Sequence, residues 1–261
     1  MERVEETARR IEDAQARYAE SFAAALARFD PSVGARSLAV GGGAAVFAGR
    51  GSPLSQALVL LDEISAADLD RIEELLGPPC RIELTPHASA ALPRLLSERK
   101  YRIGEWHQML ARPLETEWPE EPPGVEIARV GPAEADAWAR LVVASFQEKD
   151  DVPAGDARLL VPATGAEGVA CFIARVDGLA AGGATAFVSS SRAAVLAGAG
   201  VLPRFRGLGV QRALIAARLQ YAKEKGADVA ASSTLPNSLS QKNLERFGFR
   251  ILYPKAVLVR D

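Results

Sequence analysis

The chain reads Val201-Leu202-Pro203-Arg204-Phe205-Arg206-Gly207-Leu208-Gly209-Val210-Gln211-Arg212-Ala213-Leu214 at the point that decides the fold of its second half. An apolar run over residues 193–202 predicts a strand that ends at Pro203. Two closely spaced glycines follow, and the pattern then becomes helical over residues 207–225. Val210, Leu214, Ala217 and Tyr221 share one face of that helix. The stretch therefore predicts a strand, a tight turn and an amphipathic helix.

The turn has the composition of a phosphate-binding loop. Gly207 and Gly209 remove side chains where the backbone must turn sharply and where a ligand can approach. The first N–H groups of a helix have no partner within the helix and lie at the positive end of its dipole. A diphosphate can be held there by main chain alone. Arg204 and Arg206 add positive charge at the rim.

Other phosphate loops fit this sequence poorly. A Walker loop ends in Gly-Lys-Ser/Thr, which the turn lacks. Gly198-Ala199-Gly200 begins like a dinucleotide fingerprint, but it lies inside a predicted strand and Pro203 stands where the third glycine belongs. Gly41-Gly42-Gly43 precedes a strand rather than a helix.

Two blocks resemble one family. Arg206-x-x-Gly209-x-Gln211 is similar to the Q/R-x-x-G-x-G/A signature of the GNAT N-acetyltransferase superfamily. Residues 236–249 resemble the second block of that family, which ends in Gly-Phe, here Gly248-Phe249. The resemblance covers residues 125–261. It implies an α/β fold with a central mixed, mostly antiparallel sheet flanked by helices.

The resemblance also implies a cosubstrate, acetyl-CoA, and no metal. Backbone groups of the signature would hold the CoA pyrophosphate, and the edge of the preceding strand would pair with the pantetheine amides. A backbone N–H on that strand would stabilise the oxyanion formed when an amine attacks the thioester. The cofactor-binding residues expected on this basis are Val201, Leu202, Arg206, Gly207, Leu208, Gly209, Val210, Gln211, Ser240 and Asn243.

Three positions depart from the family pattern. Gln211 replaces the usual glycine or alanine, and Leu244 stands where many relatives carry a proton-donating tyrosine. The strand over residues 193–202 lacks the glutamate that often deprotonates the amine. The catalytic residues are therefore unknown. The acids that could act as base, or simply form a solvated loop, are Glu148, Asp150 and Asp151.

Three functions are compatible with these residues. The first is an acetyl-CoA-dependent N-acetyltransferase acting on a small amine. The second is a catalytically silent CoA-binding or sensor protein, suggested by the two missing proton-handling residues. The third is a nucleotide-binding protein that uses the same turn. Acids within residues 148–156 would favour polyamines or aminoglycoside-like cations as acceptors.

Composition narrows the class of protein. The chain has 261 residues and a net charge of −2, from 31 basic and 33 acidic side chains, so neither nucleic acid nor an anionic membrane is an expected partner. Residues 1–6 are charged and start no signal peptide, and no apolar run is long enough to span a bilayer. We therefore expect a cytoplasmic protein.

No metal-binding spacing is found among the cysteines and histidines, which are Cys80, Cys171, His87 and His107. Both histidines are expected to be ordinary loop or strand residues.

Length and composition predict two units. Residues 115–124 contain three prolines and four glutamates, which indicates a linker between an N-terminal α/β domain, 1–114, and a GNAT domain, 125–261. The first half carries no signature of its own, and we interpret it as a degenerate GNAT-like unit in tandem with the second. Its helix over residues 3–29 has an apolar stripe that would dock on its own domain or form a homodimer. The other elements expected in this half are strands at 37–48, 58–61, 80–84 and 101–110, and helices from Ser65 and over 88–98.

The second half is expected to begin with a strand and a helix. Asp177-Gly178 is a strong hairpin signal between two apolar runs. Around it we expect strands at 125–130, 169–176, 179–188, 228–233, 249–253 and 256–259, and helices at 132–146 and 240–246. Residues 147–161 are expected to form a loop or a broken helix.

Overall fold

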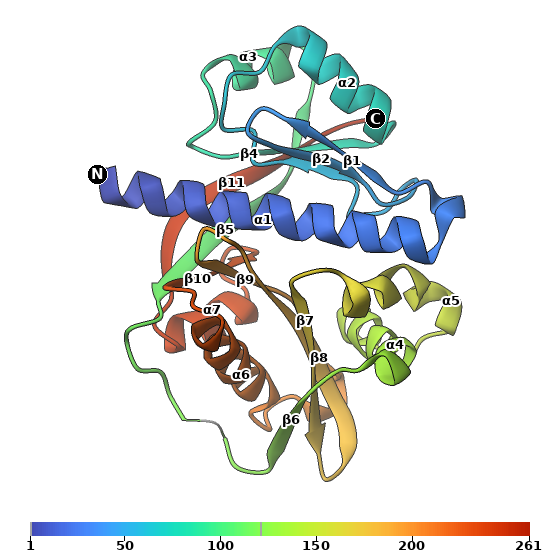
Figure 1. The fold of residues 1–261 in the computed structure, drawn as a ribbon, viewed down its shortest axis with the longest axis vertical. Helices are drawn as coiled ribbons and strands as arrows, with labels where there is room; N and C mark the ends of the chain where they lie inside the picture. Colours follow the sequence, from blue (N-terminus) through green and yellow to red (C-terminus); the bar gives the residue numbers. More distant parts are fainter. Residues whose placement is uncertain (1, 121) are drawn as a thin grey trace.

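The computed structural model describes residues 2–120 and 122–261, so Glu121 of the predicted linker lies outside the described residues. One sheet of eleven strands runs through the molecule in the order β1-β2-β3-β4-β11-β5-β10-β9-β8-β7-β6 (Figure 1). Most neighbouring strands are antiparallel, and only β3–β4 and β9–β10 are parallel. The predicted fold class, a mostly antiparallel sheet flanked by helices, is confirmed. No helix in the described ranges is long and apolar enough to cross a membrane.

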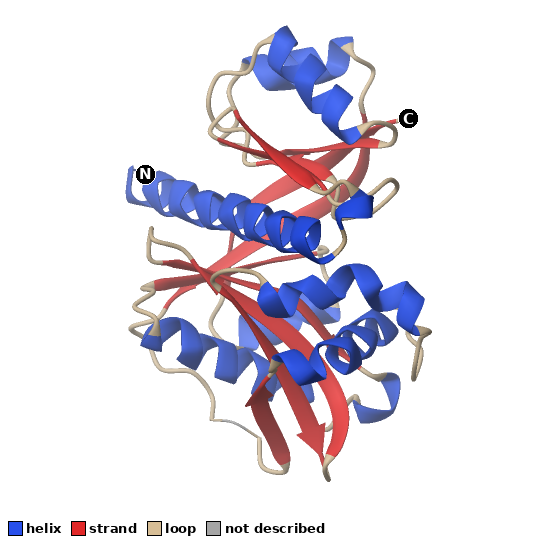
Figure 2. Ribbon diagram, turned by 45° about the vertical axis from the view of Figure 1, so that its right-hand side comes forward, coloured by secondary structure: helices blue, strands red, loops and turns tan. Residues whose placement is uncertain are grey.

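The first half begins with a long helix, α1, which crosses the middle of the molecule, while α2 and α3 gather at one end (Figure 2). The predicted strand at 37–48 is two strands, because Gly41 and Gly42 turn the chain with positive φ. The elements of this half are α1 (Glu2–Phe29), β1 (Arg36–Val40), β2 (Gly43–Phe47), β3 (Gln56–Leu58), α2 (Ala66–Leu76), β4 (Cys80–Leu84), α3 (Ala91–Glu98) and β5 (Arg102–Pro113).

The second half begins at the edge strand β6. Its hairpin forms where the sequence predicts it, because Asp177 and Gly178 both adopt positive φ, 49° and 76°, as a two-residue turn requires. The elements are β6 (Val125–Arg129), α4 (Ala135–Phe146), α5 (Ala154–Ala157), the 3₁₀ segment η3 (Arg158–Gly165), β7 (Val169–Val176), β8 (Leu179–Val188), β9 (Ala193–Val201), α6 (Val210–Glu224), β10 (Val229–Thr234), α7 (Leu239–Arg246) and β11 (Arg250–Arg260).

The C-terminus corrects one expectation. Residues 250–260 form a single strand, β11, rather than the two predicted around Pro254. A register shift between Ile251 and Tyr253 absorbs the irregularity, and Pro254 lies opposite Gln108 of β5. A proline inside a sequence pattern normally argues against a continuous strand. Here β5 lies along almost the whole of β11, which keeps the strand continuous.

The two halves repeat one order of elements and exchange their last strands. Each half runs through three antiparallel strands, a helix, a strand parallel to the third, a second helix and a final long strand: β1–β5 in the first half and β7–β11 in the second. The final strands, β5 and β11, lie side by side at the centre. Each also pairs with the parallel strand of the other half, β5 with β10 and β11 with β4. The division into domains at 115–124 stays a prediction, but the sheet is continuous across it.

α1 packs against both halves. Ala8 and Ile11 are fully buried against strands of the second half, and Ala16 and Ala23 are buried against β2 and β3. The apolar stripe predicted for this helix thus packs within its own chain.

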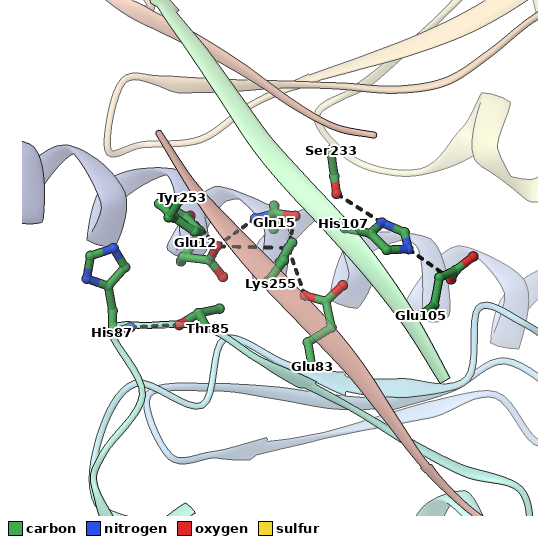
Figure 3. A network of polar contacts seen from close by, with 10 residues as sticks. All are labelled: Glu12, Gln15, Glu83, Thr85, His87, Glu105, His107, Ser233, Tyr253 and Lys255. Atoms are coloured by element: carbon green, nitrogen blue, oxygen red, sulfur yellow. Dashed lines mark hydrogen bonds and ion pairs between the residues drawn. The ribbon is translucent and has the colours of Figure 1, made fainter. Parts of the chain in front are cut away.

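A buried ionic cluster lies beneath α1 (Figure 3). Lys255 of β11 is 1% exposed, and its Nζ lies 2.8 Å from Glu83 of β4 and 3.9 Å from Glu12 of α1. It also donates to Gln15 at 2.9 Å, and the Tyr253 hydroxyl donates to Glu12. Burial alone would lower the pKa of Lys255, but the two carboxylates raise it, so the ammonium is the stable form. The cluster ties a helix and a strand of the first half to a strand of the second.

Removing the charge of Lys255 should therefore destabilise the fold. We expect Lys255→Met to lower the free energy of unfolding by about 3–5 kcal/mol, because two carboxylates are left buried without a cation. Urea denaturation followed by circular dichroism measures the change. Arg71→Met, which breaks an exposed ion pair with Asp68, is the control and should cost less than about 1 kcal/mol. Equal losses from the two variants would contradict a structural role for the cluster.

Both thiols should be unreactive in the folded protein. Cys80 and Cys171 are each 3% exposed, and burial raises the pKa of Cys171 to about 12 and that of Cys80 above its usual range. Because the thiolate is the reactive form, 5,5′-dithiobis(2-nitrobenzoate) should react with neither cysteine at neutral pH until guanidinium unfolds the chain. Rapid labelling of the native protein would show that one of these thiols is accessible.

Candidate functional site

β9 separates from β10 part-way along its length. The two strands pair only at three positions, from Ala193 with Val229 to Val195 with Ala231. β9 continues to Val201 and pairs with β8 along the way, with a register shift at Gly198, whose φ is +55°. This is a β-bulge, which twists a strand and redirects its backbone groups. Beyond Leu196, β9 therefore presents an edge that β10 does not cover.

The open edge leads into a cavity of about 790 Å³. The turn between β9 and α6, the start of α7 and the end of α4 surround it. All of the predicted cofactor-binding residues except Leu202 line this cavity: Val201, Arg206, Gly207, Leu208, Gly209, Val210, Gln211, Ser240 and Asn243. It is also lined by residues that sequence reasoning missed: Pro122, Pro123, Ser145, Phe146, Ala199, Gly200, Phe205, Arg212 and Leu239.

The turn between β9 and α6 needs its glycines. Gly207 and Gly209 have φ of +82° and +85°, in the region that favours glycine, and a Cβ on Gly209 would lie 2.9 Å from Pro122. The helix starts at Val210 rather than at residue 207, with Gly209 as its N-cap. Its first backbone hydrogen bond is donated by Ala213 to the Gly209 carbonyl, at 3.0 Å. Among the hydrogen bonds of the described residues, none is donated by the backbone amides of residues 207–212. The turn thus offers a set of free N–H groups at the positive end of a helix.

Two arginines carry charge at this turn. Arg206 is ion-paired with Glu148 at 3.2 Å, and both side chains line the cavity. Arg212, the third residue of α6, is exposed and forms no ion pair with any described residue. Its place one residue after the signature, in the first turn of the predicted helix, is the signal by which it could have been found. An anion in the cavity would meet one free guanidinium and one that is held by a carboxylate.

The three candidate catalytic acids do not share a site. Glu148 lines the cavity, whereas Asp150 is ion-paired with Arg204 at 3.0 Å and Asp151 with Arg140 at 2.5 Å, and neither lines it. A backbone hydrogen bond with Val152 and the Arg140 side chain lower the pKa of Asp151. Asp151 is thus held as a carboxylate by its own neighbours.

The backbone N–H and C=O groups of Leu202 and Val201 point in opposite directions. The Leu202 N–H donates to Ala181 of β8 at 2.9 Å, and the Leu202 side chain is 2% exposed. Leu202 therefore does not offer the free edge expected of it. Because backbone direction alternates along a strand, the groups of Val201 face away from β8 toward the open edge.

Three large apolar side chains line the cavity and are exposed. Phe146, Leu208 and Leu239 are 62%, 51% and 65% exposed, values that are unusual for side chains of this kind. Ser240 and Asn243 of α7 face the same space, and the Asn243 carbonyl accepts from Arg246 at 2.8 Å. Leu244 is 3% exposed and belongs to the core, so it contributes nothing to the cavity.

A second cavity, of about 410 Å³, lies between α1 and the middle of β9. Leu196, Ala197 and Gly198 line it, and the next residues of the same strand line the first cavity. Residues of both halves surround it, including Gln15, Tyr18, Arg81, Glu83, Glu105, His107 and Ser233. His107, which the sequence predicts to be an ordinary strand residue, lies in its wall. No sequence signal identified this cavity, because its lining comes from most of the length of the chain.

Comparison with known proteins identifies the family of this chain. A model of the Acetyltransferase (GNAT) family matches residues 105–249, more than half of the chain. The chain belongs to the GNAT family. The GNAT match starts within β5, before the predicted linker, and ends as β11 begins.

This GNAT chain is also similar to individual curated proteins and solved structures. It is 41% identical over 93 residues to the aminoglycoside N(6′)-acetyltransferase type 1 of Salmonella typhimurium, a match that covers 32% of this chain and 64% of that protein. The matched region thus spans less than two thirds of the curated relative. A GCN5-related N-acetyltransferase from Kribbella flavida shares the fold over 94% of both chains, with a TM-score of 0.61 and 19% identity. A tandem GNAT protein from the clavulanic acid biosynthesis pathway aligns over 75% of this chain and 67% of its own, with a TM-score of 0.56 and 14% identity.

The first half contains a strand-to-helix turn that corresponds to the turn between β9 and α6, but the start of its helix is capped. By the repeated order of elements, β3 and α2 correspond to β9 and α6, and the segment between them contains Asp62 and Glu63. The N-terminus of α2 is closed by a capping box, in which the Ser65 hydroxyl accepts from the Asp68 amide and the Asp68 carboxylate accepts from the Ser65 amide. The Asp68 carboxylate lies at the start of this helix, whereas the second half presents free amides at the corresponding place.

Proposed function

We propose that this protein transfers the acetyl group of acetyl-CoA to the amine of a small molecule. The observation that carries the proposal is the continuity of the first cavity, where an unpaired strand edge runs into a glycine turn whose amides are free. An edge pairs with amide groups of an extended ligand, and a helix start binds phosphate. A ligand with a pantetheine arm and a diphosphate needs both features in this order.

The residues present fit CoA. The amides of residues 207–212 would hold the pyrophosphate, with charge from Arg206 and Arg212. The backbone of Val201 would pair with the pantetheine arm, and Asn243 and Ser240 lie across the cavity to hydrogen-bond it. Ser145 closes the base of the cavity, where a Cβ on Gly200 would lie 1.7 Å from the Ser145 hydroxyl. Only glycine at position 200 leaves room there.

The chemistry needs little assistance from side chains. Acetyl-CoA supplies an activated acetyl thioester, whose thiol has an ordinary pKa of about 8.5 and can leave without a proton donor. The backbone N–H groups at the Gly198 bulge are fixed dipoles beside the end of the first cavity. The buried Leu244, in place of the tyrosine of many relatives, is therefore compatible with turnover.

Binding and turnover are tested separately. Isothermal titration with acetyl-CoA tests the cavity, and release of CoA thiol in the presence of an amine panel tests transfer. Binding with turnover supports the proposal. Binding without turnover of any amine would identify a CoA-binding or sensor protein, and affinity for ATP or NAD in place of acetyl-CoA would identify a nucleotide-binding protein.

The glycine turn can be tested by one methyl group. We expect Gly209→Ala to weaken acetyl-CoA binding at least tenfold, because the new Cβ lies 2.9 Å from Pro122 and forces the turn out of place. Gly226→Ala is the matched control, since Gly226 has a similar φ of +81° at the other end of α6 but open space around it. The two variants bear similar backbone strain, so titration should show a loss of affinity only in Gly209→Ala. An equal loss in both would indicate general destabilisation of α6.

The charge of Arg212 should act on the phosphates. Arg212→Gln should weaken the binding of acetyl-CoA about tenfold and leave the binding of pantetheine unchanged. Acetyl-CoA carries phosphates that can contact the guanidinium, whereas pantetheine carries none. Titration of both ligands measures the ratio. A parallel loss for pantetheine would contradict a phosphate contact.

A further inference from the structure

The two cavities meet on one strand. Residues 196–198 of β9 line the second cavity and residues 199–201 line the first, so the bulge at Gly198 separates them. α1 and strands of both halves line the second cavity, so the first half contributes part of its wall.

One cluster in the second cavity can accept a proton. His107 of β5 has its Nε2 2.8 Å from the Glu105 carboxylate and its Nδ1 3.2 Å from the Ser233 hydroxyl (Figure 3). Ser233 lies on β10 just beyond the point where β9 separates from it. The imidazole side chain is 24% exposed, so a ligand can reach it. The carboxylate of Glu105 orients the imidazole ring.

The charges of this cavity suit a single cation. Glu83 is already neutralised by Lys255 at 2.8 Å, and Arg81 lies 3.7 Å from Glu105. A ligand with several ammonium groups would find Glu105 already in contact with Arg81 and His107, and it would be repelled by Arg81.

Most of the rest of the wall is apolar, although Gln15, Tyr18 and Gln56 add three polar side chains. Leu54 in the loop before β3 is 42% exposed at the cavity, and the other apolar side chains of the wall include Ala19, Phe22, Val46, Pro53, Leu58, Leu160, Val195, Leu196 and Val257. Burying apolar ligand surface against such a wall is favourable, whereas burying hydroxyl and ammonium groups without partners is costly.

We infer that the second cavity is the acceptor site, that it binds a primary amine carried on an apolar body, and that His107, oriented by Glu105, is the base. The inference rests on the proposed acetyl transfer and names its acceptor class. The amine enters as an ammonium ion. His107 takes one proton, the nitrogen forms a bond to the acetyl carbon as the carbon–sulfur bond breaks, and the second proton leaves with the CoA thiol. This acceptor class differs from the aminoglycosides that the curated relatives are named for.

The acceptor class is tested with phenethylamine and kanamycin as probes. We expect CoA release with phenethylamine and at least tenfold lower kcat/KM with kanamycin. Leu54→Asp should lower kcat/KM for phenethylamine at least tenfold, because it places a carboxylate against the apolar body. Leu179→Asp, at an exposed leucine on the β7–β8 hairpin, is the control and should change nothing.

The base is tested with His107→Gln. We expect kcat for phenethylamine to fall about 10²–10⁴-fold, with acetyl-CoA affinity unchanged. The loss should be at least tenfold smaller for O-benzylhydroxylamine, which has a similar apolar body but is neutral at the pH of the assay. Glu105→Gln should give a smaller fall with the same preference for the neutral amine, because Glu105 acts through His107. A purely structural role for either residue would reduce both amines equally.

The outcomes separate the two claims. Failure to bind acetyl-CoA would overturn the proposed function and the acceptor site with it. Normal acetyl-CoA binding with faster turnover of kanamycin, or with turnover of neither amine, would overturn the acceptor site alone. Equal losses for the two apolar amines in His107→Gln would overturn the assignment of the base.

Discussion

The separation of β9 from β10 after Val195 is the constraint on which the rest of the molecule depends. A parallel pair that stayed closed would satisfy the backbone groups of β9 with β10 and leave nothing for a ligand. The bulge at Gly198 turns the strand away, and successive residues of the strand line two cavities. Unpaired backbone groups are costly in a protein interior, so this edge is stable only where solvent or a ligand can reach it.

The exchange of final strands explains how a chain of two similar units forms one sheet. β5 and β11 lie next to each other and each completes the sheet of the other half, so neither half has a full set of strands without its partner. The ion cluster around Lys255 forms at this junction and orients α1 across it. The wall of the second cavity contains residues of α1, β4 and β5 together with residues of β9 and β10. Its shape is therefore a consequence of the exchange.

The repeated order of elements also allows the free N-terminus of α6 to be compared with the capped N-terminus of α2. α6 begins after glycines and leaves its amides free, whereas at the start of α2 the Asp68 amide donates to the Ser65 hydroxyl and the Ser65 amide donates to the Asp68 carboxylate. A capping box of this kind stabilises the helix by the same interactions that would otherwise bind an anion. The first half thus keeps the scaffold and contributes walls to the acceptor side.

The sequence by itself determined what short-range physics controls. The glycines at 207 and 209, the helix after them, the Asp177-Gly178 hairpin and the capping box at Ser65 follow from backbone preferences within a few residues, and all were predictable. Most of the lining of the first cavity was also predictable, since it belongs to that same turn. Tertiary structure alone decided the continuity of β11 across Pro254, the exchange of β5 with β11, and the grouping of Glu105 and His107 with Ser233. His107 and Ser233 come from strands that are separated by most of the second half of the chain. They meet because β5 pairs with β10, and no local pattern encodes which strand lies beside which.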